Sequence, residues 1–236
     1  MIRISVSDLE TWRYWSANED STMDELLARL RHEEPPTPAM EAGRAFAKLM
    51  EHAKPGALDV ETVDGWTFDF TLLDGASFAL PTVREIKAEV PFVTPSGPVT
   101  LVGMVDQLDG LIVHDEKLTE RWDAERYFDS MQWRAYLVMF GARAFVYDVF
   151  QCRRNEDDRH VTITDYQAIT FYDYPAIRAD VQDAVNELAA VIVRYLPDRV
   201  TRMASCGHPL HPRGFGCTHD GCANDSRQFA TSEATR

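Results

Sequence analysis

The chain has 236 residues, 45% of them hydrophobic, and a formal net charge of −14. Its twelve Phe, eight Tyr and five Trp are enough to build a core, which excludes an intrinsically disordered chain. The acidic balance argues against tight, non-specific binding to duplex DNA, because neutralising the phosphates usually requires a basic surface.

The first part of the chain is expected to be helical. Ser7 is a predicted N-cap, with Asp8 and Glu10 in the first turn of the helix that follows it. Apolar residues at helical spacing predict further helices over residues 21–32 and 38–52, and a proline-rich stretch separates the two.

Short β-rich runs follow the helices. Gly, Pro and Asp separate these runs, which predicts an antiparallel meander with strands at residues 66–73, 83–93, 98–107 and 110–116. The remaining pattern predicts a helix, two strands and a long amphipathic helix, at residues 127–140, 144–153, 161–169 and 175–195. This succession predicts an α/β protein in which helices pack on a sheet.

The hairpin formed by the last two strands of the meander carries the strongest functional signal. Asp106 ends one apolar run, and Asp115 and Lys117 end the next. Because side chains alternate along a strand, Asp115 and Lys117 should project from one face while Glu116 points away. Two carboxylates and an ammonium would suit a hard divalent cation and phosphodiester hydrolysis. Taken singly, each acid is also an ordinary turn-former or surface residue.

Two helical segments carry further polar candidates. Gln132 and Tyr136 are four residues apart, so they share one face of a helix. Tyr136 equally suits the apolar core stripe of that helix, which would leave Gln132 in solvent. Glu51 lies near the end of a helix, where an acid is slightly unfavourable against the helix dipole. It is either an ordinary surface residue or held there by a cation.

Taken in order, these residues resemble the PD-(D/E)XK nuclease superfamily, in its RecB-like branch of phage recombination exonucleases and CRISPR-associated RecB-like nucleases. That branch has a helix with Gly-x-x-x-His-x-x-x-Glu, strands with Gly-x-x-Asp and Asp/Glu-x-Lys, and a helix with Gln-x-x-x-Tyr. Four pairs of residues match these motifs: Gly43 and Glu51, Gly103 and Asp106, Asp115 and Lys117, and Gln132 and Tyr136. With the similar opening at residues 4–9, the resemblance covers about residues 2–150.

Two positions depart from the branch. Ala47 stands where its helical His falls, so a His ligand is missing. Trp15 lies near the place of the cysteine found in its iron–sulfur members, so a four-cysteine cluster of that kind is not expected.

The resemblance implies a restriction-endonuclease-like core, a central mixed sheet flanked by helices, in a nuclease domain at residues 1–200. It implies that Mg²⁺ or Mn²⁺ is held by the Glu51, Asp106 and Asp115 carboxylates and by the Glu116 carbonyl. Lys117 would orient the attacking water or stabilise charge on the phosphate oxygens. Gln132 and Tyr136 would contact the scissile phosphate or its neighbouring nucleotide.

The Cys/His-rich segment at residues 201–223 is a separate candidate metal site. Cys206, His208, Cys217 and Cys222 would suit a structural Zn²⁺, although the segment contains no Cys-x-x-Cys pair. A flexible tail with surface thiols and an incomplete iron–sulfur site are the alternatives. The small, polar residues 224–236 predict a disordered tail.

The expected activity is therefore metal-dependent DNA exonuclease cleavage in phage or bacterial recombination, replication or repair. Single- or double-stranded DNA would be the substrate, and a recombination protein is a candidate partner; the oligomeric state is left open. The alternatives are a catalytically inactive nucleic-acid-binding accessory with a structural zinc site, and a zinc-binding interaction protein. No apolar run approaches the roughly 20 residues that cross a bilayer, and a signal-peptide pattern is missing, so a cytoplasmic protein is expected.

Overall fold

The computed structural model describes residues 1–54, 58–73, 78, 80 and 83–200, and Ile2–Val200 form one compact unit. The predicted Cys/His segment and the predicted tail, residues 201–223 and 224–236, lie outside the described residues. No helix within the described ranges has both the length and the apolarity needed to span a bilayer.

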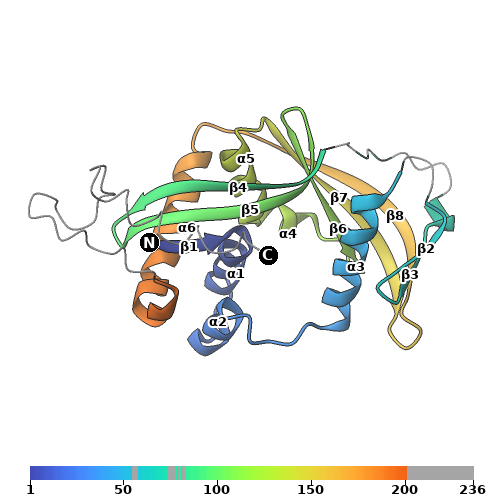
Figure 1. The fold of residues 1–236 in the computed structure, drawn as a ribbon, viewed down its shortest axis with the longest axis horizontal. Coiled ribbons are helices and arrows are strands. Elements are labelled where there is room, and N and C mark those ends of the chain that lie inside the picture. Colours follow the sequence, from blue (N-terminus) through green and yellow to red (C-terminus); the bar gives the residue numbers. More distant parts are fainter. Residues whose placement is uncertain (55–57, 74–77, 79, 81–82, 201–236) are drawn as a thin grey trace, which may run out of the picture. The chain divides into compact units, whose positions relative to one another are not determined.

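One mixed sheet runs through this unit (Figure 1). Its eight strands in the described residues pair in the order β1-β5-β6-β7-β8-β3-β2, and β4 also pairs with β5. The pairs β1–β5, β6–β7 and β3–β8 are parallel and the others antiparallel. The strands are β1 (Ile2–Ser5), β2 (Val60–Val63), β3 (Trp66–Asp69), β4 (Val83–Thr94), β5 (Gly97–Asp109), β6 (Ile112–Thr119), β7 (Ala144–Asn155) and β8 (His160–Tyr172).

Helices cover the sheet in two groups, each with its own apolar core. The first core joins five helices to strands that include β1 and β5, and the second joins α3 to β3, β7 and β8. The helices are α1 (Val6–Ser16), α2 (Met23–Leu30), α3 (Pro38–His52), α4 (Ala124–Asp129), α5 (Met131–Phe140) and α6 (Ile177–Tyr195), with 3-10 turns at Thr71–Leu73 and Pro197–Arg199. A central mixed sheet flanked by helices confirms the predicted fold class.

Aromatic packing decides the strand order around α3. The Phe46 ring of α3 lies 5.6 Å from the Phe68 ring and 5.1 Å from the Phe150 ring, measured between centroids. These contacts hold β3 beside β8, in parallel, instead of beside β4. The predicted meander is therefore wrong at its first strand, and only β4, β5 and β6 form consecutive antiparallel pairs. The hydrophobic pattern predicts that a segment is a strand but does not determine which strand it pairs with.

Two helix boundaries differ from those predicted. Ser5, and not Ser7, caps α1: Ser5 Oγ accepts the Asp8 N–H at 3.0 Å, and the Asp8 carboxylate accepts the Ser5 N–H at 2.9 Å. This reciprocal pair satisfies two donors at once. The helix predicted at residues 127–140 is divided into α4 and α5, because Ser130 adopts an extended conformation and caps α5.

Candidate active site

The paired part of the β5–β6 hairpin ends next to the predicted acids. Backbone pairing of the two strands reaches Gln107↔His114 and stops there. At the following position Asp106 Oδ2 accepts the Glu116 N–H at 2.9 Å. The Asp106 carboxylate therefore occupies the place of a backbone acceptor, beside the end of β6 that carries the other predicted site residues.

Asp115 is buried, with 3% of its surface exposed, and both of its oxygens have polar partners. Oδ1 accepts a hydrogen bond from Gln132 Nε2 at 2.7 Å, and Oδ2 forms an ion pair with Lys117 Nζ. Burial raises the pKa of Asp115 to about 7, the Lys117 charge opposes this rise, and the Asp106 charge adds to it. Burial also raises the pKa of Asp106. Both carboxylates thus bind a proton more readily than a free aspartate does, although the Lys117 charge opposes this.

Lys117 is the cation of this group. One third of its side chain is exposed, and Nζ lies 5.8 Å from the centroid of the Tyr147 ring. Burial lowers the pKa of Lys117, but the carboxylates of Asp115 and Asp106 outweigh burial, so that the pKa rises above its ordinary value. Lys117 is therefore charged at neutral pH, which favours an electrostatic role over that of a general base.

Gln132 and Tyr136 both project from α5 toward the hairpin. The Gln132 amide holds Asp115, as described above, and the Tyr136 hydroxyl donates to the Met104 carbonyl of β5 at 2.7 Å. The recorded contacts of Gln132 and Tyr136 are thus with the Asp115 carboxylate and with the backbone of β5. Their predicted contact with a phosphate stays a prediction.

Glu10 of α1 fixes the amino end of α5. Its Oε2 accepts the Met131 N–H at 2.8 Å and the Ser130 hydroxyl at 2.9 Å. Ser130 Oγ in turn accepts the Tyr147 hydroxyl at 3.0 Å, and that hydroxyl lies 3.4 Å from Gln132 Oε1. A continuous chain of hydrogen bonds therefore connects α1 to the amide that holds the buried aspartate. Sequence patterns missed this role of Glu10, because its partners lie more than a hundred residues away.

We expect Glu10→Ala to lower the free energy of unfolding by about 1–2 kcal/mol. Hydrogen bonds to a charged acceptor contribute roughly this much, and the Glu10 side chain is one third exposed, which weakens them. Urea unfolding measures the change. Glu19→Ala is the matched control, because Glu19 is an exposed acid shortly after the end of the same helix. Equal stability of the two variants would contradict the role given to Glu10.

Glu51 has recorded contacts of its own at the end of α3. Its Oε2 is 3.7 Å from His52 Nδ1, at the carboxyl end of α3. The backbone carbonyls of this helix end, that of Glu51 included, accept hydrogen bonds from the Arg84 guanidinium of β4. A cation at this end also suits the helix dipole. The structure thus groups Asp106 and Asp115 with the lysine, and groups Glu51 with His52 and Arg84.

A buried polar cluster lies on the other face of β6. His114 Nδ1 is 2.8 Å from Asp148 Oδ2, and the Tyr166 hydroxyl donates to Asp148 Oδ1 at 2.6 Å. The Glu116 carboxyl accepts a hydrogen bond from the Gln107 amide. This cluster is not among the predicted sites, although Asp148 is a lone acid in the apolar run 144–150. A charge at such a position requires partners.

Glu116 gives a prediction on stability and pH. Burial, followed by the charges of Asp106 and Asp148, raises its pKa to about 9 from the ordinary 4.5. Between these two values the folded chain binds a proton that the unfolded chain releases, so stability falls as pH rises. Glu116→Gln stays neutral and escapes this loss. In EDTA, we expect the stability of Glu116→Gln relative to wild type to increase from pH 5 to pH 9, by at most about 1.4 kcal/mol per pH unit.

Urea unfolding at three pH values tests this expectation, with the exposed Glu125→Gln as control. A difference between Glu116→Gln and wild type that does not change with pH would contradict it.

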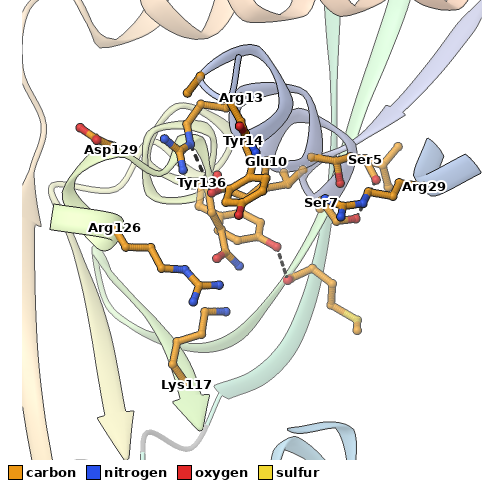
Figure 2. A pocket seen from close by; sticks show the side chains of 18 of the residues that line it. Ser5, Ser7, Glu10, Arg13, Tyr14, Arg29, Lys117, Arg126, Asp129 and Tyr136 are labelled. Atoms are coloured by element: carbon orange, nitrogen blue, oxygen red, sulfur yellow. Dashed lines mark hydrogen bonds and ion pairs between the residues drawn. The ribbon is translucent and has the colours of Figure 1, made fainter. Parts of the chain in front are cut away.

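A pocket of about 1420 Å³ opens over the hairpin (Figure 2). Lys117, Gln132 and Tyr136 line it from β6 and α5, and side chains of α1, α2, β4 and α4 complete its wall. Figure 2 shows Lys117 and Arg126 extending into this space. The buried Asp115 lies behind Lys117, to which it is ion-paired.

The chemistry of the acid pair suits a hard divalent cation. Mg²⁺ takes oxygen ligands, often only one or two carboxylates, and keeps several waters. The raised pKa values of Asp106 and Asp115 mean that further positive charge would stabilise the ionised pair. Among the residues that the structure describes, no group of three or more His, Cys, Asp and Glu side chains is arranged to hold a metal ion. Asp106 and Asp115 are therefore the donors that the recorded contacts support, and the predicted role of Glu51 as a further ligand stays a prediction.

No family model and no curated protein matches the chain. A candidate exonuclease from Eubacterium rectale is similar in structure, with 13% identity over 85% of this chain and 83% of that chain, and a TM-score of 0.48. The alkaline exonuclease of Laribacter hongkongensis, in complex with dAMP, has 13% identity over 83% of this chain and 92% of that chain, and a TM-score of 0.41. At these identities the likeness concerns the fold alone.

Proposed function

We propose that this protein is a metal-dependent deoxyribonuclease that degrades DNA from its ends. The observation that carries the proposal is the charge arrangement at the open end of the β5–β6 hairpin. Asp106 and the buried Asp115 lie beside an ammonium, Lys117, that lines a large pocket. Hydrolysis of a phosphodiester needs these two kinds of charge together, anions to hold a metal and a cation to face the phosphate.

Asp106 and Asp115 would hold Mg²⁺ or Mn²⁺. Such an ion lowers the pKa of a bound water and polarises the phosphate. Gln132 keeps the Asp115 carboxylate in one orientation by donating to Oδ1. Lys117 is ion-paired with Asp115 and also lines the pocket. Its ammonium group would stabilise the negative charge that develops on the phosphate oxygens during hydrolysis. Burial of the pair strengthens each of these interactions.

A digestion series tests the proposal. Linear single-stranded DNA, linear duplex and closed circular plasmid are incubated with Mg²⁺, with Mn²⁺ or with EDTA. We expect both linear forms or one of them to be degraded with either metal, and every substrate to survive in EDTA. If the closed circular plasmid were degraded as rapidly as the linear DNA, the protein would be a nuclease but not an exonuclease. No degradation in any arm would overturn the proposal in favour of an inactive accessory protein.

A further inference from the structure

Tyr14 is an aromatic side chain placed for contact with a ligand. It projects from α1, 49% of it is exposed, and it lines the pocket described above. The Arg29 guanidinium lies 6.0 Å from the centroid of its ring. The neighbouring Trp12 and Trp15, by contrast, stack on each other at 5.2 Å and pack against the core. Tyr14 is thus the aromatic residue of this helix that the core does not use.

Arg126 stands out among the charged side chains that line the pocket. For Arg126 of α4, no ion pair is recorded among the described residues, and Figure 2 shows its guanidinium extending into the pocket near Lys117. Two of the lining acids already have donors. Glu10 binds the amino end of α5, and Asp123 Oδ1 accepts the first N–H groups of α4 at 3.1 and 3.3 Å. Arg126 is therefore available to a phosphate, whereas the other lining cations have partner acids: Arg13, Arg29, Lys87 and Lys117.

The size of the pocket suits several linked units. Its volume of about 1420 Å³ exceeds the roughly 300–1,000 Å³ of a typical small-molecule site. Lys117 and Arg126 come from β6 and α4, whereas Tyr14 and Arg29 come from α1 and α2. A ligand that reaches both sets must span the pocket, as a short chain of nucleotides does.

Single strands fit this arrangement better than duplexes. A base reaches the face of an aromatic ring only after it leaves its own stack, which costs pairing energy in a duplex but not in a single strand. The net charge of −14 also disfavours a duplex, whose charge density is the higher of the two. An exposed aromatic ring beside cations is the usual means of binding single strands without sequence preference.

We propose that the pocket binds the end of a single DNA strand, with one base stacked on Tyr14 and phosphates further along the strand against Arg126 and Lys117. The proposal rests on the proposed nuclease function and names its substrate class.

Fluorescence anisotropy tests the proposal on the full chain. The probes are a labelled oligothymidylate of about 12 nucleotides and a blunt duplex of the same length. The wild-type protein in EDTA serves as the parent, because the proposed cleavage requires a metal and the probe then stays intact. Tyr14→Ala is the test variant and Tyr14→Phe keeps the ring. Tyr172→Ala removes an exposed tyrosine, 69% exposed, from β8 outside the pocket.

We expect Tyr14→Ala to weaken binding of the single strand about 5- to 20-fold, the loss of one stacked base. Tyr14→Phe and Tyr172→Ala should bind as the parent does. The duplex should bind more weakly than the single strand, and Arg126→Gln should lower the slope of log affinity against log salt by about 0.7. Affinity of Tyr14→Ala within about twofold of the parent would overturn the proposal, as would a duplex that binds at least as tightly as the single strand.

Failure of this proposal differs from failure of the nuclease assignment. Should the wild-type protein cut no DNA while single-strand binding still depends on Tyr14, the nuclease assignment falls and the binding site stands. Should it cut DNA while Tyr14→Ala binds normally, the binding site falls and the nuclease assignment stands.

Discussion

Lys117→Ala is expected to fold normally and to lose about 10²–10³-fold of the metal-dependent DNA cleavage rate, the usual effect of removing one charge that stabilises a transition state. The partly exposed ammonium leaves little apolar contact to lose, so the far-UV circular dichroism should not change. The rate is measured on linear DNA under single-turnover conditions. Lys48→Ala, which removes an exposed lysine of α3, is the matched control.

Removal of a site carboxylate should also abolish DNA cleavage. Asp106→Ala removes a carboxylate that bridges the two strands, whereas Asp109→Ala removes an exposed one from the end of the same strand. We expect cleavage to disappear in the first variant and to persist in the second. Undiminished cleavage by both Lys117→Ala and Asp106→Ala would remove these residues from the catalytic machinery, whatever the fold.

Gly103→Ala is expected to destabilise the protein by about 1–3 kcal/mol, or by more if the helices cannot shift. A Cβ at this position would lie 2.6 Å from Tyr136 Cε1 and 2.9 Å from Val6 Cγ2, closer than packed carbon atoms approach. The added methyl group must displace α5 or α1 from β5, and with it the Tyr136 hydroxyl from the Met104 carbonyl. Equilibrium unfolding in urea measures the cost.

Gly43→Ala is the matched control, since both glycines belong to the motifs noted in the sequence. A Cβ at Gly43 meets nothing within 4 Å, and the residue lies inside a helix. Alanine there should leave stability unchanged or raise it by up to about 1 kcal/mol. Equal effects of the two substitutions would show that close helix packing is not the reason for Gly103.

The sequence predicts the site where local rules suffice. Alternation along β6 predicts that Asp115 and Lys117 share a face, and the structure has them ion-paired. The bounds of α3 follow from Thr37, Pro38 and the apolar spacing, and the predicted helix at residues 38–52 agrees with the one observed. Both arguments use neighbours within a few residues.

Rules that use only neighbouring residues do not predict contacts between residues far apart in the sequence. The grouping of Glu51 with the other acids follows from its place in a motif and stays a prediction, because the position of α3 depends on aromatic packing and on the Arg84 contact with its end. Glu10 and Asp148 were missed because their partners lie on distant elements. A spacing pattern does not contain that information.

The sheet topology has a consequence for how the chain reaches its native state. Thr67 of β3 pairs with His160 of β8, and Ile2 of β1 pairs with Val99 of β5, so two of the strand pairs join segments that are far apart in the sequence. Sheets rich in such pairings acquire structure slowly. During synthesis on the ribosome, the aromatic cluster around Phe46 stays open until β8 has emerged. Refolding rates should therefore be more sensitive to changes in β8 than to changes in the local helix α2.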